Sequence, residues 1–531
     1  MEKLATAYAA IDWTTTPPEV DVPRHYNAAV DFVDRHITEG RGGKTAFIDD
    51  SGTLTFDELA QQVNRAGNML RNLGLRQEDR VLLVAHDSNA YPAIFWGALK
   101  AGIVVVAVNT LLTADDYRYM LADSRARAVI VQDALVPELA AAAEGQTHLE
   151  HRIVVGDQVD GWQSFDGLMQ AAPADLEPAE TVADDVAFWL YSSGSTGRPK
   201  GAPHIHSDLV YTVALYGVPV LGITDEDVVF SAAKLFFAYG LGNGMTFPMY
   251  VGATAVLMAE RPTPESVAKR LKAHQPTIFY GVPTLYAGVL TDEGINRKTT
   301  SQRLRICVSA GEALPEDVAL RWQDRFGAPI ADGIGSTELL HIFLSNRPED
   351  IRYGTTGKPV PGYDIRLTDD EGNDVADGDI GDLWVSGPTA APYYWNNRAK
   401  SIDTFHGPWT RTGDKYIRDA DGYFTYAGRS DDMLKVSGIW VSPFEVESAL
   451  TAHPAVIEAA IVGRADGDDL VKPEAFLVLN DGVEGSDALA AELQTFVKDR
   501  LAPYKYPRWI NFVAELPKTA TGKTQRFKLR Q

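Results

Sequence analysis

The sequence predicts an α/β protein with at least two domains. Its length of 531 residues exceeds what a single hydrophobic core usually supports. In the first third of the chain, continuous runs of valine and isoleucine alternate with amphipathic helical patterns. This arrangement is typical of parallel strands that are covered on both faces. The composition then changes near residue 354 and again at residue 428, which indicates two further structural units.

The N-terminal elements follow from capping signals and hydrophobic periodicity. Thr55 and Glu58 form the pattern of a capping box, and apolar residues then recur at helical spacing until Gly74 ends the helix. Beyond this helix, the sequence predicts strands over 81–85, 103–108 and 128–132, and helices over 91–100 and 115–122.

The middle of the chain has a different character. Residues 354–424 are dense in glycine, aspartate and proline and contain short strand-like pieces, so a smaller β-rich subdomain is expected there. The polar run GRSDDMLK, residues 428–435, separates this region from a new pattern, and we therefore expect a domain boundary at Ser430–Asp431.

A compact α+β unit is predicted after this boundary. Ser442, Pro443 and Glu445 indicate a second capping box with proline at the first helical position. Strands over 456–463 and 475–480 and a helix over 487–501 follow. A unit of about 100 residues is large enough to fold alone.

Charge and cysteine content exclude several classes of protein. The formal net charge of −23 argues against a protein that binds nucleic acid or an anionic membrane surface, although one local basic site is enough for a small anion. Cys307 is the only cysteine and lies in an apolar stretch, so we expect a buried structural thiol. The N-terminus lacks the apolar core of a signal peptide, which predicts a cytoplasmic protein.

The segment YSSGSTGRPKG, residues 191–201, is the first candidate site. Six small residues, Ser192 to Gly197, follow an apolar run that ends a predicted strand, and Lys200 comes three residues later. Backbone N–H groups in such a turn can point together and bind phosphate oxygens. The alternative interpretation is a solvated, flexible loop, and this segment alone leaves both open.

Other motifs for nucleotide or nucleophile chemistry are not matched. The tail TATGKT, residues 519–524, ends like a P-loop, but Pro517 stands where the first glycine should be. The segment 240–244 fails the dinucleotide pattern because Met245 takes the place of the final glycine. The sequence has no G-x-S-x-G, and a single cysteine with scattered histidines disfavours a zinc site.

Three further motifs each have a structural alternative. Glu338 in IGSTE could bind a hard cation such as Mg²⁺, or it could simply favour a helix start. Asp414 in RTGD could accept two ribose hydroxyls, or it could cap a turn. Lys523 in PKTATGK lies in a polar tail, where an ordinary solvated surface lysine is the usual interpretation.

Taken together, these motifs are similar to those of the adenylate-forming acyl-CoA synthetase superfamily. YSSGSTGRPKG, IGSTE, RTGD, YAGRSDDMLKVSG and PKTATGK occur in that family's order and cover the chain almost end to end. Four more stretches resemble the aromatic-acid branch, the benzoate–CoA ligases: KLFFAYGLGNGMTFP, FYGVPTLY, VSAGEALP and DGIGSTELLHIFLSN.

The resemblance implies a fold and a reaction. It implies a large N-terminal domain of two stacked mixed sheets with helices, residues 1–430, which includes the β-rich subdomain, and a small mobile α+β lid, residues 431–531, with a hinge at Asp431. It also implies ATP, Mg²⁺ and coenzyme A. A carboxylate would attack the α-phosphate of ATP to give an acyl-adenylate, and the CoA thiol would then displace AMP.

The resemblance also implies roles for individual residues. Glu338 would organise Mg²⁺, Thr337 would lie near the α-phosphate, and Lys523 would bridge the carboxylate and the α-phosphate. After rotation at Asp431, the loop of Lys435, Ser437 and Gly438 would line the pantetheine tunnel. The implied nucleotide-binding residues are Ser192, Ser193, Gly194, Ser195, Thr196, Gly197 and Lys200 for the phosphates, Ala310, Gly311, Glu312, Asp332 and Gly333 for adenine, and Asp414 and Arg429 for ribose.

The acid pocket should be apolar and shaped for a flat ring. The candidates are Phe236, Ala238, Tyr239, Leu241, Val282, Ile334, Gly335, His341 and Ile342. Tyr239 and His341 would supply the polar edge, and the set contains no lysine or arginine for a second carboxylate, which favours an aromatic monocarboxylic acid. The resemblance is also the basis for expecting a homodimer.

Three alternative functions remain open at this stage. An adenylating enzyme could pass the acyl group to a carrier protein or another nucleophile, although no carrier module follows Gln531. A luciferase-like oxygenase would share the ATP half of the reaction. A non-catalytic nucleotide sensor is disfavoured because Lys523, Glu338 and Asp414 are all present.

Overall fold

Two mixed sheets form the body of the protein in the computed structural model, which describes residues 8–192, 198–430, 432–436, 439–466, 471–518 and 524–530. The seven-stranded sheet has the order β11 (Lys200–Ile205), β10 (Val186–Ser192), β6 (Val104–Ala107), β5 (Arg80–Val84), β7 (Ala128–Gln132), β8 (His151–Val155) and β9 (Gln163–Ser164). The neighbours from β10 to β9 pair in parallel, and β11 is antiparallel to β10. The parallel strands expected over 81–85, 103–108 and 128–132 are therefore confirmed.

The second sheet has nine strands. Their order is β18 (Lys358–Pro359), β17 (Ile342–Ser345), β16 (Ile330–Gly335), β15 (Ile306–Ser309), β14 (Ile278–Gly281), β12 (Val228–Ser231), β13 (Thr254–Val256), β3 (Thr45–Asp49) and β4 (Gly52–Thr55). Six strands, from β3 to β16, pair in parallel, and antiparallel strands close both ends.

Alternate residues of the central strands pack into different cores. Val81 and Leu83 of β5 belong to a large buried cluster that also contains Tyr280 of β14, so this cluster joins the two sheets. Leu82 and Val84 point the other way and pack with residues of α4 and α5. Successive side chains of a strand point to opposite faces. A strand covered on both faces therefore reads as a continuous apolar run.

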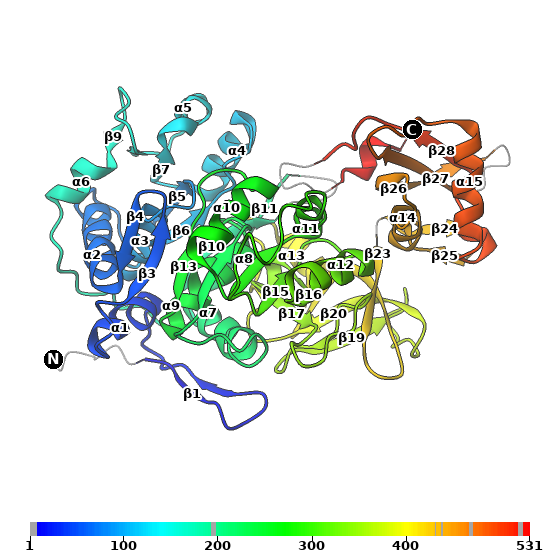
Figure 1. The fold of residues 1–531 in the computed structure, drawn as a ribbon. Helices are drawn as coiled ribbons and strands as arrows, with labels where there is room; N and C mark the ends of the chain where they lie inside the picture. The colour runs from blue at the N-terminus through cyan, green and yellow to red at the C-terminus, as the bar shows by residue number, and fades with distance from the viewer. Residues whose placement is uncertain are drawn as a thin grey trace.

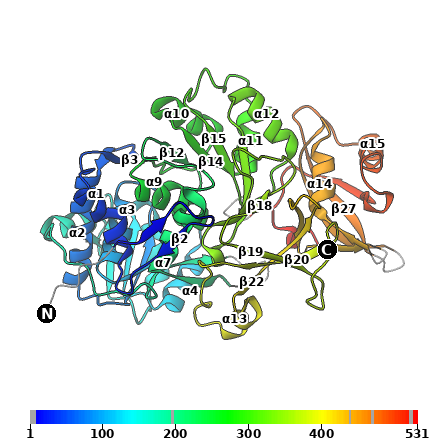
Figure 2. The ribbon, with the colours of Figure 1, turned by 90° about the horizontal axis from the view of Figure 1, so that it is seen from below.

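Helices lie on both faces of these sheets (Figures 1 and 2), and some are internal: every residue of α3 from Tyr91 to Lys100 is buried, in the cluster that joins the two sheets. Their bounds are α1 (Arg35–Thr38), α2 (Phe56–Asn72), α3 (Ala90–Lys100), α4 (Ala114–Ser124), α5 (Val136–Ala143), α6 (Phe165–Ala171), α7 (His206–Thr212), α8 (Ala238–Leu241), α9 (Phe247–Val251), α10 (Pro264–His274), α11 (Pro283–Leu290) and α12 (Glu316–Phe326). The capping box of Thr55 and Glu58 starts α2 as expected. Cys307 is buried on β15, as expected of a structural thiol, and this burial raises the pKa of the thiol.

The β-rich region forms a separate five-stranded sheet. It contains β19 (Asp364–Thr368), β20 (Ile380–Ser386), β21 (Phe405–His406), β22 (Trp409–Arg418) and β23 (Phe424–Arg429), with α13 (Arg398–Thr404) between β20 and β21. The RTGD motif lies inside β22, so the alternative of a turn capped by Asp414 is wrong. Gly413 takes a φ of +77° there, a conformation that glycine adopts without strain.

The residues after 430 form a small α+β unit at one end of the molecule, drawn in orange to red in Figure 1. Strands β24 (Leu434–Val436) and β25 (Ile439–Val441) pair with each other, and β26 (Val456–Ala465), β27 (Val471–Leu479) and β28 (Trp509–Phe512) form a sheet beside α14 (Pro443–Thr451) and α15 (Asp487–Lys498). The rings of Tyr426 on β23 and Phe444 on α14 lie 5.5 Å apart, so this unit contacts the five-stranded sheet.

Only half of the second capping box forms. The Ser442 side chain accepts a hydrogen bond from the Glu445 backbone N–H at 3.1 Å. The Glu445 carboxylate does not return this bond, because it accepts two hydrogen bonds from Lys505 at 2.6 Å. An ion pair with a distant lysine has replaced the local bond that the sequence pattern predicts.

At the N-terminus, β1 (Ala10–Asp12) and β2 (Glu19–Asp21) form a hairpin that extends from the body (Figure 1). Within the described ranges, no helix combines the length and the apolar character needed to cross a membrane.

Candidate active site

The first candidate site lies where β10 meets β11. Ser192 at the end of β10 pairs in register with Lys200 at the start of β11. Strands β10 and β11 thus run antiparallel from the two ends of the small-residue segment. Ser193, Gly194, Ser195, Thr196 and Gly197 themselves lie outside the described residues.

The second candidate site is the turn that joins β16 to β17. Ser336 caps this turn by accepting a hydrogen bond from the Leu339 backbone N–H at 3.3 Å, and Glu338 lies in the first turn of the short helix that follows. Two contacts hold the backbone: His204 bonds to the Thr337 carbonyl at 2.8 Å, and the Ala391 N–H donates to the Glu338 carbonyl at 2.7 Å. The side chain of Glu338 is left to interact with other elements.

The Glu338 carboxylate and the Lys200 ammonium both contact the side chain of Tyr394. The Tyr394 hydroxyl donates to Oε1 of Glu338 at 2.6 Å. Lys200 Nζ lies 3.5 Å from the same hydroxyl oxygen and 4.6 Å from the centre of the Tyr394 ring. The structure therefore brings together the cation and the carboxylate of two motifs that are far apart in the sequence.

The electrostatics of this group keep the carboxylate ionised. Burial alone would raise the pKa of Glu338, but the Tyr394 hydrogen bond and the Lys200 charge outweigh it and lower that pKa. Burial lowers the pKa of Lys200, and the charge of Glu338 opposes this shift. Burial, followed by the negative charge of Glu338, raises the pKa of Tyr394, so its hydroxyl keeps the proton that it donates.

This donor set fits a magnesium ion that is bound together with phosphates. Among the described residues no cluster of three or more His, Cys, Asp or Glu side chains could hold a metal by itself. Mg²⁺ at nucleotide sites is usually held by one or two carboxylates, substrate phosphates and several waters. The ionised Glu338 can supply such a carboxylate.

The expected ribose-binding pair is formed. Asp414 on β22 pairs in register with Arg429 on β23, and the Arg429 guanidinium donates to the Asp414 carboxylate at 3.2 Å. Asp414 is buried, and Arg429 also donates to the Thr412 carbonyl at 3.1 Å. Gly413 leaves room for this guanidinium, since a Cβ there would come within 2.8 Å of it.

The expected adenine-flanking residues lie at the carboxyl ends of two parallel strands. Ala310, Gly311 and Glu312 directly follow β15, and Asp332 and Gly333 lie on β16. Glu312 accepts a hydrogen bond from the Thr284 hydroxyl at 2.7 Å. Burial raises the pKa of Asp332 well above its usual value. This edge of a parallel sheet is where ligands bind in α/β folds.

The expected acid-pocket residues come from four segments. Phe236, Ala238, Tyr239 and Leu241 lie just before or on α8, Val282 caps α11, Ile334 and Gly335 end β16, and His341 and Ile342 lie at the start of β17. Tyr239 and His341 lie together, with ring centres 6.1 Å apart. The Tyr239 hydroxyl faces the backbone carbonyls of Val308, at 2.9 Å, and Gly281, at 3.2 Å, so its polar end is engaged by the chain.

Aromatic rings and a glycine surround His341. The rings of Phe247 and Tyr216 lie 4.5 and 5.2 Å from the imidazole. A Cβ on Gly242 would come within 2.4 Å of the imidazole, so only glycine fits there without displacing it. Burial lowers the pKa of His341 to about 3, against the pull of the Tyr239 backbone, and the ring is therefore neutral at physiological pH.

Four of the expected residues, Asp431, Ser437, Gly438 and Lys523, lie outside the described residues. The backbone of Lys435 lies on β24, and its side chain is also outside the description.

The motifs did not indicate three residues that the structure places at the site. Tyr394 contacts Glu338, and the buried pair of His204 and Asp208 supports Thr337. Tyr394 lies in a loop whose sequence matches no motif, and His204 has the sequence context of an ordinary strand residue. Only the alternation of β11, which turns His204 inward, could have indicated a buried role.

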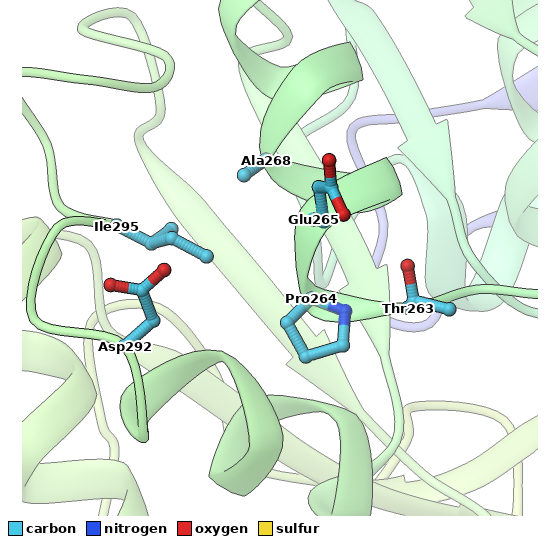
Figure 3. Close-up of a pocket in the computed structure, with 6 residues that line it drawn as sticks. All are labelled: Thr263, Pro264, Glu265, Ala268, Asp292 and Ile295. Carbon is cyan, nitrogen blue, oxygen red and sulfur yellow. The ribbon is translucent and has the colours of Figure 1, made fainter.

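A surface depression elsewhere shares none of these residues. Thr263, Pro264, Glu265 and Ala268 at the start of α10 line it together with Asp292 and Ile295 (Figure 3). It is an open feature of the outer surface and is separate from the candidate site.

Comparison with known proteins agrees with this geometry. The AMP-binding enzyme family matches residues 34–395, and its C-terminal domain matches residues 445–523. The chain belongs to the AMP-binding enzyme family, whose members form adenylates.

Particular relatives are similar over nearly the whole chain. A benzoate–CoA ligase of Thauera aromatica is 58% identical over 521 residues, which cover 98% of this chain and 98% of the relative. A crystal structure of a benzoate CoA ligase from Burkholderia xenovorans LB400 is 54% identical with a TM-score of 0.89, and the match covers 95% of this chain and 100% of that one. An anthranilate CoA ligase solved with anthranoyl-AMP is 45% identical with a TM-score of 0.92, over 96% of this chain and 97% of that one.

Proposed function

We propose that this chain is an ATP-dependent aryl-CoA ligase that acts on benzoate or a close analogue. One observation carries the proposal: Glu338 and His341 belong to the same turn between β16 and β17, so the metal side of the nucleotide site adjoins the apolar acid site. An acid bound at His341 would present its carboxylate close to the α-phosphate. Such proximity can supply a large part of a bimolecular barrier.

In the first half-reaction, a carboxylate oxygen of the acid attacks the α-phosphorus of ATP, and the bond to pyrophosphate breaks. Lys200 and the 192–197 segment would bind the β- and γ-phosphates, Asp414 and Arg429 the ribose hydroxyls, and residues 310–312 with Asp332 and Gly333 the adenine. Lys523 would bridge the two reacting groups and stabilise the charge that builds on the α-phosphoryl oxygens. A magnesium ion held by Glu338 would neutralise phosphate charge when bound.

In the second half-reaction, the CoA sulfur attacks the carbonyl carbon of the adenylate, and the bond to AMP breaks. We propose that residues 431–531 rotate about Asp431 between the two steps. Lys523 would leave the site, and Lys435, Ser437 and Gly438 would enter and line the pantetheine tunnel. The main body, residues 1–430, keeps the nucleotide and acid sites.

The pocket favours an uncharged aromatic ring. His341 is neutral, its neighbours Phe247 and Tyr216 are aromatic, and none of the expected pocket residues is a lysine or arginine. A second carboxylate on the ring would therefore lack a partner and would be costly to bury. Benzoate is the acid given in the names of two similar proteins, the ligase of Thauera aromatica and that of Burkholderia xenovorans LB400, and we propose it as the first substrate to test.

The test measures AMP and pyrophosphate release with MgATP and benzoate, with and without CoA, and follows benzoyl-CoA by mass spectrometry. We expect AMP and benzoyl-CoA to appear together only when CoA is present. Pyrophosphate without thioester would instead indicate another acceptor, such as a carrier protein. No turnover with benzoate would contradict the acid, and a panel of substituted benzoates would then identify the substrate or contradict the activity.

The expected homodimer is a separate proposal that rests on the family resemblance. Sedimentation velocity of the purified protein checks it, and a single species of about 58 kDa would contradict it, since the chain has a mass of 57.9 kDa.

A further inference from the structure

Tyr394 is buried although it lies in a loop. The residue is 3% exposed, whereas the preceding Tyr393 is 38% exposed. The Tyr394 ring packs in a small cluster with Ala202, Ala391 and Phe405, and its ring centre lies 5.2 Å from that of Phe405. The Tyr394 backbone N–H also donates to the Ser401 hydroxyl at 2.9 Å, which anchors the loop to α13.

The buried hydroxyl of Tyr394 is directed at the phosphate side of the site. It donates to Oε1 of Glu338 at 2.6 Å, and its oxygen lies 3.5 Å from Lys200 Nζ. The ammonium also lies 4.6 Å from the ring centre, within the range of a cation–π contact. One side chain thus contacts both charged groups that the phosphates and the metal would use.

The loop of residues 389–395 reinforces this arrangement through its backbone. The Ala391 N–H donates to the Glu338 carbonyl, and the Thr389 hydroxyl donates to the Leu339 carbonyl, both at 2.7 Å. The Trp395 N–H donates to the Gly201 carbonyl, next to Lys200, at 2.8 Å. The loop therefore connects the Glu338 turn with strand β11, and Tyr394 is the member that reaches the side chains of both.

We propose that Tyr394 is a positioning residue for MgATP, which sets the orientation of the Glu338 carboxylate and of the Lys200 ammonium before the nucleotide arrives. The inference rests on the proposed function, because it requires that this site binds MgATP. Glutamate and lysine have many rotamers, and ordering them only when the ligand binds would reduce affinity. The hydroxyl fixes the carboxylate in advance, and the ring supports the ammonium.

The test is Tyr394→Phe, which removes only the hydroxyl and keeps the ring that packs against Ala202 and Phe405. The matched control is Tyr393→Phe, which makes the same change on the adjacent, exposed tyrosine. Binding of ATP is measured by calorimetry without acid or CoA, once with Mg²⁺ and once with EDTA. Thermal unfolding of each variant shows whether it is folded.

We expect Tyr394→Phe to weaken the binding of MgATP about tenfold or more, which is the effect of losing a hydrogen bond to a charged group. Binding of ATP in EDTA should change by less than threefold, because the Lys200–ring contact remains. Tyr393→Phe should behave as the wild type in both measurements. In the adenylation assay, the KM for MgATP should rise and the KM for the acid should not, a split that general loosening of the fold would not produce.

A double-mutant cycle with Glu338→Gln tests whether Tyr394 acts through Glu338. If it does, Tyr394→Phe should have little further effect in the Glu338→Gln background. Additive effects, or wild-type MgATP affinity in the folded Tyr394→Phe variant, would overturn the inference and leave the proposed function intact. Failure of the wild-type protein to bind MgATP would overturn both.

Discussion

His204 donates a hydrogen bond from Nε2 to the backbone carbonyl of Thr337 at 2.8 Å, directly beside Glu338. A carbonyl oxygen only accepts, so Nε2 carries a proton. The other ring nitrogen, Nδ1, lies 2.9 Å from the Asp208 carboxylate, and both side chains are buried. The imidazole thus connects the first turn of α7 with the turn that presents Glu338.

Two substitutions of His204 separate the bonds of this histidine. In His204→Asn the amide can replace Nδ1 and keep the Asp208 contact, whereas in His204→Gln the longer amide can replace Nε2 and keep the Thr337 contact. We expect the Asn variant to raise the KM for MgATP about fivefold to tenfold, because it releases the Thr337–Glu338 turn. The Gln variant should keep this KM closer to wild type but unfold at a lower temperature, because the buried Asp208 loses its contact with His204 and keeps only the hydrogen bond from the Ile205 backbone N–H.

Steady-state kinetics and thermal unfolding check both variants. Equal effects of Asn and Gln on the KM for MgATP would contradict the role of the Thr337 bond.

Gly242 gives room to His341, and Gly242→Ala should disturb the acid site selectively. The added methyl would lie 2.4 Å from the imidazole and 3.0 Å from the Phe247 ring, so the imidazole must move. We expect the KM for the aromatic acid to rise at least about tenfold, while the KM for ATP stays within twofold. Initial-rate kinetics with each substrate varied in turn measures both constants.

Gly288→Ala on α11 is the matched control, since a Cβ there meets Pro264 at an ordinary 3.5 Å. An unchanged KM for the acid in Gly242→Ala would contradict the placement of His341 in the acid site.

Asp414→Asn should weaken recognition of ribose. The substitution removes the charge that pairs with Arg429 and replaces one acceptor by a donor. We expect the KM for ATP to rise about tenfold or more. The preference of the enzyme for ATP over 2′-deoxy-ATP should shrink as well, because a hydroxyl contact is lost. A variant that keeps the full preference would argue against the assignment.

Asp377→Asn is a suitable comparison for the ribose test. Asp377 pairs with Arg418 of the same strand β22, but both side chains are more than 40% exposed. Because exposed ion pairs contribute little, this variant should have wild-type kinetics.

Asp87 makes the stability of the protein depend on pH. Burial raises the pKa of Asp87 to about 6, although the Lys234 charge opposes this shift. The folded protein therefore keeps this proton up to about pH 6, whereas the unfolded chain releases it near pH 4. Stability at this position is highest below pH 4, falls as the pH rises to 6, and stays low above that.

Asp87→Asn should lack this loss because an amide does not titrate. Its side-chain oxygen can still accept the hydrogen bond from the Leu235 N–H, which Asp87 accepts at 3.2 Å. Relative to wild type, the variant should gain up to about 3 kcal/mol between pH 4 and pH 7. Urea unfolding of both proteins at the two pH values measures this gain. If the unfolding free energies of the two proteins differed by the same amount at pH 4 and pH 7, Asp87 would not titrate in this range.

Lys523→Ala should impair only the first half-reaction. A cation held at the α-phosphoryl oxygens stabilises charge that develops during adenylation, so we expect this step to slow by at least about 10²-fold. Thioester formation from supplied aryl-adenylate and CoA should stay near the wild-type rate. Single-turnover measurements of each step test this, and equal losses in both would disprove the assignment of Lys523.

Much of the fold could be predicted because its signals are local. The Thr55 cap, the parallel strand β5 and the β-rich region all follow from residues that are neighbours in sequence. The second capping box failed for the opposite reason, because Lys505 competes for Glu445 from 60 residues away. A local pattern does not record such a competitor.

The sequence by itself determined which chemical groups are available and in what order: the small-residue segment 192–197, Lys200, Glu338, Asp414 and Lys523. Only the tertiary structure decided which other residues reach them. Tyr394 meets Glu338 across 56 positions of sequence, and His204 meets the Thr337 carbonyl across 133. These two contacts depend on how β11, the β16–β17 turn and the 389–395 loop pack together. Because the packing of distant segments depends on the whole hydrophobic core, a short motif cannot predict it.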